Sequence, residues 1–341
     1  MIRKIILFLV LLPYSLFCQI QTSSYNSLNL ISSARSLSLG GDVISIVDND
    51  VSLASNAPSL LNPSMHNQLA FNFVDYVSDI NLVSVHFSKQ ILNNVMVFTG
   101  IEAINYGEFV STDETGNILS NFSANEQIIT IGTSRYLGRN FSIGSNFRLL
   151  NSNLEAYNSV SISSNISATY FVREKEFGIT CLVKNIGRPL KEYTSSQETL
   201  PFQVQIGISK SLDHLPFRYS ILLHHLNIYD ISNDFSPNTI YDPITNSLVV
   251  KEETIAKKLL RHVIIGGELY PFRRDIYLRG GFNFQRQEDL KLSSSFSMSG
   301  FSWGFGFSLR KLRIDYSRSA LHSSSMVNSF SVTTNLSNFG F

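Results

Sequence analysis

The sequence is poor in the features that staple small secreted domains or carry a chain through a membrane as helices. It has two cysteines in 341 residues, one tryptophan, and charged side chains at 16% of positions, with a net charge of +1. Beyond its first residues, no apolar run reaches the roughly 18 residues that a membrane-spanning helix needs. These shortages exclude a disulfide framework, a basic surface for nucleic acid and a helical membrane protein.

The chain has instead a repeated alternation of apolar and small polar residues from about residue 67 to its end. In one example, apolar residues at 301, 303, 305, 307 and 309 (Phe301, Trp303, Phe305, Phe307, Leu309) alternate with Gly and Ser at 300–308. Period two places one set on each face of a β-strand. Over strands of about ten residues, it predicts one face toward lipid and one toward a polar lumen. A soluble β-protein whose apolar face packs in a core is the alternative.

The alternation predicts about fourteen strands, an even number that lets one antiparallel sheet close on itself. They are 67–76, 80–90, 94–104, 125–136, 139–150, 158–172, 176–187, 201–211, 215–228, 260–270, 274–286, 300–310, 312–320 and 326–337. The predicted fold class is all-β: a transmembrane antiparallel β-barrel of about 14 strands with an N-terminal hatch or plug segment. The predicted parts are a signal peptide (1–18), the hatch (19–66) and an outer-membrane barrel (67–341).

The lengths of the connections support a barrel in a membrane. Every second connection is short, at 91–93, 137–138, 173–175, 212–214, 271–273 and 311. The connections between them include long ones at 105–124, 188–200, 229–259 and 287–299, whereas 77–79 is short. Outer-membrane barrels have short periplasmic turns and longer outside loops, so we predict that the long loops face outside.

The two ends of the chain fit export to the bacterial outer membrane. Arg3 and Lys4 precede a short apolar stretch and Cys18, as in a secretory signal peptide. Lipidation of Cys18 stays open as an alternative, and Cys181 is expected to be a small apolar strand residue. The last predicted strand runs into a terminal aromatic residue, Phe341, which resembles the recognition signal of outer-membrane barrels.

The segment 19–66 does not alternate, so we expect it not to belong to the barrel wall. A barrel of roughly fourteen strands encloses more space than side chains fill. The segment is therefore predicted to fold back inside as a plug, with Gly40, Gly41, Asp50, Asn56 and Pro58 as its marked residues. These residues resemble the N-terminal hatch of FadL-type outer-membrane proteins, which are fourteen-stranded barrels known for fatty-acid uptake. That family has Asn-Pro-Ala where this chain has Asn56-Ala57-Pro58.

Several later motifs resemble the PorQ family of the type IX secretion system. They are 106–109 (YGEF), 113–117 (DETGN), 122–126 (FSANE), 200–203 (LPFQ), 223–226 (LHHL) and 261–268 (RHVIIGGE). The resemblance implies a barrel without enzymatic activity in a cell-surface attachment complex. Its implied partners are a surface protein of PorZ type, which binds anionic lipopolysaccharide, together with PorU and PorV.

The outside loops supply the candidate binding residues. The expected contacts for a partner protein are Glu108, Asp113, Glu114, Asn117, Tyr229, Asp230, Phe235 and Tyr241. A calcium site at Asp113, Glu114 and Asn117 is the alternative, but their spacing matches no calcium-loop motif. Ile255, Leu259 and Leu260 recur at helical spacing, so a short amphipathic helix is predicted over 251–261, either as a partner contact or as a lid.

No pattern of catalytic residues is present. His224 and His225 are adjacent, so in a strand they would point to opposite faces and could not share a metal ion. They and His262 are expected to be satisfied lumen histidines. We therefore predict no enzyme, no catalytic residue, no cofactor and no metal site.

The sequence thus predicts an outer-membrane β-barrel that anchors the type IX secretion attachment complex through its outside loops. Outer-membrane lipid or lipopolysaccharide and the PorZ-type protein are its expected partners, and nucleic acid is not one. A FadL-like channel for small hydrophobic molecules is the alternative function.

Overall fold

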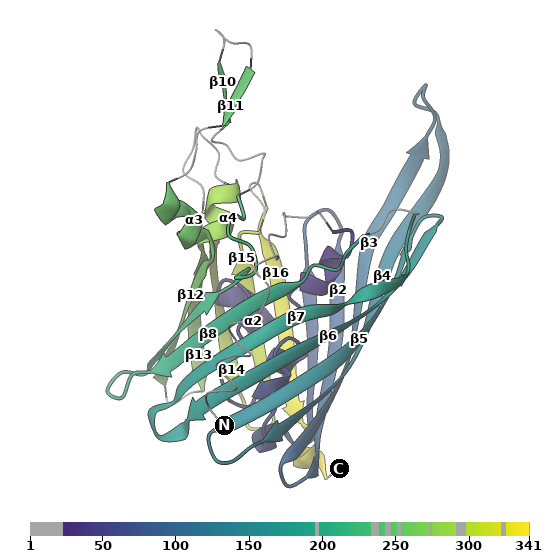
Figure 1. The fold of residues 1–341 in the computed structure, drawn as a ribbon. Helices are drawn as coiled ribbons and strands as arrows, with labels where there is room; N and C mark the ends of the chain where they lie inside the picture. The colour runs from purple at the N-terminus through teal and green to yellow at the C-terminus, as the bar shows by residue number, and fades with distance from the viewer. Residues whose placement is uncertain are drawn as a thin grey trace, which may run out of the picture.

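The computed structural model describes residues 23–194, 198–232, 239–242, 247–250, 254–272, 275–290, 298–321 and 325–340. Fourteen antiparallel strands form one closed barrel (Figure 1), in the order β1-β16-β15-β14-β13-β12-β9-β8-β7-β6-β5-β4-β3-β2. They are β1 (Gln68–Asp75), β2 (Asn81–Leu92), β3 (Val95–Thr112), β4 (Ile118–Tyr136), β5 (Phe141–Leu154), β6 (Tyr157–Val172), β7 (Phe177–Lys191), β8 (Gln203–Ser211), β9 (Phe217–Leu223), β12 (Val263–Phe272), β13 (Ile276–Asn283), β14 (Phe301–Ser308), β15 (Leu312–Ser319) and β16 (Val327–Asn335). Two further strands, β10 (Thr239–Asp242) and β11 (Ser247–Val250), pair with each other and with no other described strand.

The barrel closes where the first strand meets the last. Gln68 pairs with Ser88 of β2 on one side and with Asn335 of β16 on the other, and both ladders continue to Asp75. A closed sheet has no free edge, so its backbone groups are paired within the wall. The predicted barrel of about 14 strands is confirmed.

The wall has its apolar face outside, which is the reverse of a soluble protein. In β14, Phe301 and Trp303 are exposed, whereas Ser302 and Gly304 are buried. Strand β6 repeats the pattern, with Ile166 52% exposed between buried polar residues. Because the buried face is the polar one, the alternative of a packed apolar core is wrong, and the exterior suits lipid.

Residues 23–66, called the inner segment below, lie inside the barrel against its inner face (Figure 1). The segment contains one short α-helix and four short 3-10 helices: η1 (Asn26–Asn29), α2 (Ala34–Ser38), η2 (Val51–Ser55), η3 (Pro58–Leu60) and η4 (Pro63–Met65). Asp50 caps η2 by accepting a hydrogen bond from the Ser52 backbone, and Pro58 and Pro63 occupy the first positions of η3 and η4. The two prolines thus favour the start of η3 and η4. The predicted signal peptide (1–18) lies outside the described residues.

The connections follow the predicted alternation at one end of the barrel. At the end where β1 begins, all six connections are short: 93–94, 137–140, 173–176, 212–216, 273–275 and 309–311. At the other end, called the long-loop end below, 192–202, 224–262 and 284–300 are long. The predicted loop at 105–124 is wrong, because β3 and β4 continue as a hairpin that projects beyond the barrel (Figure 1). The β-branched Val110, Thr112 and Ile118 favour this extension.

Two short helices, α3 (Ile255–Arg261) and α4 (Phe284–Leu290), lie at the long-loop end. The helix predicted over 251–261 is observed from Ile255, and its first three residues fall outside the described chain. Helix α4 replaces the end of the strand predicted over 274–286. Ion pairs of Lys257 with Glu288 and of Arg261 with Asp289 join the two helices. Across the described parts of the chain, neither these helices nor any other has the length and apolar character needed to span a bilayer.

Candidate functional site

A polar cluster inside the barrel is centred on Glu268 of β12, which is 1% exposed. Its carboxylate contacts three guanidinium groups, with Arg35 Nε at 2.8 Å, Arg218 Nη2 at 2.6 Å and Arg279 Nε at 2.8 Å. Tyr270 Oη donates a further hydrogen bond to it at 3.0 Å. Arg35 belongs to α2, whereas the other groups belong to β9, β12 and β13. This carboxylate therefore joins the inner segment to the barrel wall.

Further ion pairs extend this arrangement to four acidic and four basic side chains. Asp48 accepts from Arg35 Nη2 at 2.6 Å, and Asp315 accepts from Arg279 Nη1 at 2.6 Å. The members, called the charge cluster below, are Arg35, Arg218, Arg279, Arg313, Asp48, Asp50, Glu268 and Asp315. Their formal charges cancel. Buried charges persist only when each is paired, so the cluster fixes the inner segment against β9, β12, β13 and β15.

The inner face of β1–β5 carries an apolar row within an otherwise polar surface. Val74 pairs with Leu82, and Leu82 pairs with Ile104 on the next strand. Ile128 and Leu150 pair on β4 and β5. All five side chains are at most 1% exposed. This row, called the apolar ledge below, crosses five adjacent strands.

The beginning of the inner segment covers the apolar ledge. Tyr25, Leu28 and Ile31 pack on it, and the first two are fully buried. Tyr25 Oη shares a hydrogen bond with Ser159 Oγ at 2.9 Å, and Leu28 O accepts one from Arg148 Nη1 at 2.9 Å. Residues 23–31 contain no charged side chain. Hydrophobic contact and hydrogen bonds, without ion pairs, hold this stretch in place.

The sequence reasoning missed both features, apart from Asp50. For each feature, the alternation of inward and outward positions along the strands could have shown which residues face the lumen. Glu268 and Arg279 occupy inward positions, flanked along their strands by outward residues. Leu82 and Ile104 are apolar residues on the same inward parity, where serine, threonine and asparagine prevail.

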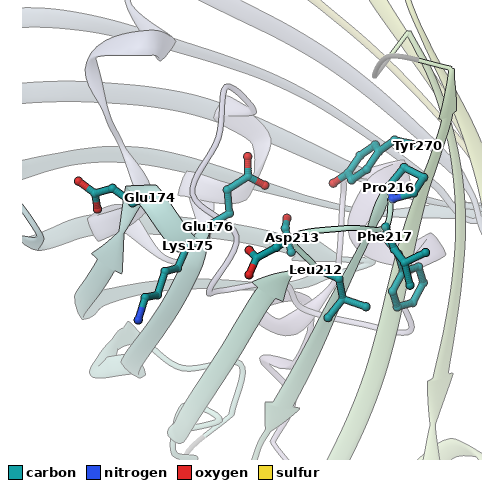
Figure 2. Close-up of a pocket in the computed structure, with 10 residues that line it drawn as sticks. Glu174, Lys175, Glu176, Leu212, Asp213, Pro216, Phe217 and Tyr270 are labelled. Atoms are coloured by element: carbon teal, nitrogen blue, oxygen red, sulfur yellow. The ribbon is translucent and has the colours of Figure 1, made fainter.

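Two cavities lie at the short-turn end of the barrel. The first, of about 340 Å³, lies between the β6–β7 and β8–β9 connections, with Glu174, Lys175 and Asp213 in its lining and Tyr270 beside it (Figure 2). The second, of about 310 Å³, is lined by charged residues that include Asp48 and Arg218, and also by the apolar Val47, Pro63 and Phe171. Charged linings of this kind suit water or polar solutes. The cavities therefore bring solvent to the edge of the charge cluster.

The predicted plug residues Gly40 and Gly41 lie against the wall at β12 and β13. A Cβ on Gly40 would lie 2.9 Å from Ile264 Cγ2 and 3.0 Å from Phe282 N, and the backbone there has φ of +95°. A Cβ on Gly41 would lie 2.8 Å from Ile264 Cδ1. The glycines thus allow the chain to turn close to the wall.

The other predicted plug residues lie deeper in the segment and do not form one site. Asp50 joins the charge cluster through Arg35 at 3.2 Å. Asn56 donates a hydrogen bond to Asp42 at 2.9 Å. Pro58 approaches β5 so closely that a Cβ on Gly144 would lie 2.5 Å from its carbonyl carbon. That this segment closes the lumen to solutes stays a prediction.

The predicted contacts Glu108, Asp113, Glu114 and Asn117 all lie on the projecting β3–β4 hairpin. Asp113 accepts hydrogen bonds from Thr115 and Asn117 within its own turn. These bonds, from Thr115 first and then Asn117, lower the pKa of the Asp113 carboxyl to about 2. Its oxygens thus serve the turn, and the described residues contain no group of three or more potential metal ligands.

The remaining predicted contacts lie across the barrel mouth from the hairpin. Tyr229 is 60% exposed, and Asp230 forms an ion pair with Lys258 at 2.5 Å. Phe235 lies outside the described residues, and Tyr241 is on β10. Four strands, β5 to β8, separate β4 from β9, so the structure does not bring the two predicted sets together.

The prediction for His224 and His225 is wrong in two respects. Strand β9 ends at Leu223 and His225 has φ of +53°, so the two rings turn toward each other with Nδ1 atoms 2.6 Å apart. His224 Nε2 is buried and has no hydrogen-bond partner among the described residues. The two ring nitrogens of His262 lie 2.8 and 3.2 Å from the carbonyl oxygens of His224 and Tyr229, so the nitrogen that carries the proton has an acceptor.

Comparison with known proteins places the fold. No protein-family model matches the chain, and no curated protein matches it in sequence. The CymD monoaromatic hydrocarbon channel is similar in structure, with a TM-score of 0.52 at 10% identity over 92% of this chain and 99% of that one. The Pseudomonas putida toluene transporter TodX has a TM-score of 0.51 at 14% identity, over 89% and 97%. A Pseudomonas aeruginosa FadL homologue has a TM-score of 0.45 at 11% identity, over 93% and 99%.

The chain therefore has the fold of hydrocarbon channels of this type: a closed fourteen-stranded antiparallel barrel. The expected fourteen-stranded barrel is confirmed at the level of fold, which CymD and TodX share. The resemblance to the PorQ family, the partners it implies and the absence of enzymatic activity stay predictions.

Proposed function

We propose that the chain is a bacterial outer-membrane barrel that admits small hydrophobic molecules. The apolar ledge is the observation that carries this proposal, because an apolar solute needs an apolar surface within a polar lumen. The outward apolar face supports a place in the membrane, and the fold likeness to CymD and TodX supports a channel.

In this proposal a solute binds the ledge in place of Tyr25, Leu28 and Ile31. Burying one such side chain contributes about 1.5–3 kcal/mol. A solute of similar apolar area recovers a similar free energy from the same surface. The apolar part of the exchange is then nearly balanced, and no ion pair of residues 23–31 has to break. The hydrogen bonds of Tyr25 Oη and Leu28 O are lost on displacement.

Toluene uptake tests the proposal. Cells that carry the chain in the outer membrane should take up labelled toluene faster than cells with an empty vector. Ile128→Asn places an amide in the ledge and should reduce uptake to near background. Thr130→Asn is the matched control, since it lies on the same strand and the same face but outside the ledge. Wild-type uptake equal to background would overturn the proposal.

A second candidate function, surface anchoring, rests on the β3–β4 hairpin. Residues 106–123 pair only with each other among the described strands, because the ladders to β2 and β5 stop at Asn105 and Ala124. The hairpin thus projects roughly 20 Å. Val110, Ile118 and Leu119 are 54%, 72% and 65% exposed. The segment has three acidic and no basic side chains, so it suits a protein partner with an apolar, basic surface.

The resemblance to the PorQ family makes a PorZ-type surface protein the proposed partner, within a complex that includes PorU and PorV. Replacing 107–122 with an Asn-Gly turn should release that protein from the cell surface and leave the barrel folded. Toluene uptake should be unchanged, which separates the two functions. Retention of the PorZ-type protein on cells with the shortened hairpin would contradict the anchor.

A further inference from the structure

A separate cavity of about 130 Å³ lies at the long-loop side of the inner segment, between that segment, the wall and α4. Its polar lining comes from five parts of the chain and includes Asp42, Gln203, Gln205, His224, Asn283 and Arg286. It shares none of these residues with the charge cluster. It also lies apart from the apolar ledge. Of the three residues that cover the ledge, Ile31 also lines this cavity.

Two buried polar atoms of this lining have no hydrogen-bond partner in the part of the chain that the structure describes. They are His224 Nε2 and Gln205 Oε1, in side chains 4% and 2% exposed. His224 Nδ1 is already engaged with His225 Nδ1 at 2.6 Å, and Gln205 Nε2 donates to Gln203 Oε1 at 2.7 Å. Buried polar groups are normally satisfied, so two orphans on one cavity point to a ligand that satisfies both.

The cavity also has an excess positive charge. Arg286 of α4 has no ion-pair partner in the described parts of the chain, and its Nη1 donates to Gly40 O at 3.1 Å. Among the described residues of the lining, the one acidic group is Asp42, which forms an ion pair with Lys184 at 3.0 Å. Burial, and then the neighbouring His225, hold the pKa of His224 well below its usual range, so His224 is neutral at pH 7. The uncompensated charge is therefore that of Arg286.

We propose that this cavity binds a small oxyanion that also carries a hydroxyl group. The oxygen atoms of the anion accept hydrogen bonds from Arg286 and from the His224 Nε2–H. The hydroxyl group of the anion donates one to Gln205 Oε1. The volume corresponds to about four water molecules, which suits hydrogen phosphate. Guanidinium groups are preferred partners of phosphate oxygens.

Calorimetric titration of the purified full chain in detergent with inorganic phosphate tests the site. Saturable binding is expected, and Arg286→Gln should weaken it at least tenfold. Gln205→Leu should weaken it several-fold, because it removes the acceptor for the hydroxyl group. It also removes the hydrogen bond from Gln205 Nε2 to Gln203 Oε1, so its folding is checked separately. Arg139→Gln, in an exposed ion pair with Glu174, is the control and should bind as the wild type does.

The arms of the experiment separate the possible sources of the phosphate group. Dimethyl phosphate, which has the diester chemistry of a phospholipid headgroup but no hydroxyl, should bind at least tenfold more weakly than inorganic phosphate. Equal binding of the two would overturn the assigned role of Gln205. Absence of phosphate binding by the folded wild type, or equal binding by Arg286→Gln, would overturn the site. Heat-modifiable gel mobility shows that each variant is folded.

Discussion

The two halves of the barrel wall hold the inner segment by different physics. Strands β9, β12, β13 and β15 hold it through the charge cluster, where Glu268 alone faces three arginines. Strands β1–β5 hold it through the apolar ledge and hydrogen bonds. Loss of one partner from a buried ion-pair network leaves an uncompensated charge, whereas an apolar contact is replaceable by any apolar group of similar size. The difference identifies one half as the fixed side of the segment and the other as the exchangeable side.

The sharpest challenge to this comparison is Glu268→Gln. The substitution keeps the shape of the side chain but leaves Arg35, Arg218 and Arg279 without their shared carboxylate. We expect a loss of about 3–5 kcal/mol of stability, measured as a lower temperature for the gel-mobility shift between the folded and unfolded forms. Glu174→Gln, in the exposed pair with Arg139, should change stability by at most about 1 kcal/mol. Equal effects of the two variants would refute the fixed side.

On the exchangeable side, Leu28→Ala tests the cover of the ledge. The truncation leaves a cavity over Ile104 and its neighbours and should cost about 2–4 kcal/mol in the same gel assay. It should also raise toluene uptake, because less of the ledge is covered. Leu278→Ala, at an outward position 46% exposed, is the control and should leave uptake unchanged. Reduced uptake by folded Leu28→Ala would argue against exchange.

On the fixed side, the backbone of the inner segment lies very close to β13, which predicts an effect of a small substitution on stability. A Cβ on Gly281 of β13 would lie 2.1 Å from Leu39 C and 2.2 Å from Gly40 N, so the backbone of the inner segment has to shift. Gly281→Ala should therefore cost about 1–3 kcal/mol. On the same strand, Gly280→Ala meets only Ser302 O at 4.0 Å and should be nearly neutral. A harmless Gly281→Ala would mean that the segment is looser here than the distances indicate.

The smallest expected effect concerns Asp113 at the hairpin tip, whose carboxylate is stabilised by hydrogen bonds and not by an ion pair with any described residue. The pKa of Asp113 is lowered to about 2 by hydrogen bonds from Thr115 and Asn117. A lowered pKa means that this turn is favoured above the ordinary Asp range near 4, and that the contribution is lost as pH falls through about 2. A carboxyl titration by NMR should give that midpoint, and Asn117→Ala should move it upward. A wild-type midpoint near 4 would show that the turn bonds do not persist in solution.

Much of the wall was predictable, because strand alternation is a local property. The fourteen barrel strands were all expected near their observed positions, and the outward apolar face of β14 follows from residues 300–309 alone. The hairpin at 106–123 and helix α4 were not predicted. Turn residues such as Gly116 mark a break without showing how far the flanking strands extend.

The candidate sites were less predictable, since each joins residues that are far apart in the chain. Asp50 was singled out, but its partner Arg35 and the arginines of the wall were not. The pairing of Arg35 with Glu268 spans 233 positions. The orphaned Nε2 of His224 depends on a left-handed turn at His225 that no local pattern indicated.

The sequence by itself determined that this chain forms strands with one apolar and one polar face, because period two fixes side-chain direction whatever the strand pairs with. Only the tertiary structure decided which inward residues contact the inner segment. Some form ion pairs with it, some form the apolar ledge beneath it, and some line a cavity beside it. Those outcomes depend on the register and closure of the barrel, which bring Glu268 to Arg35 and Leu82 to Ile104.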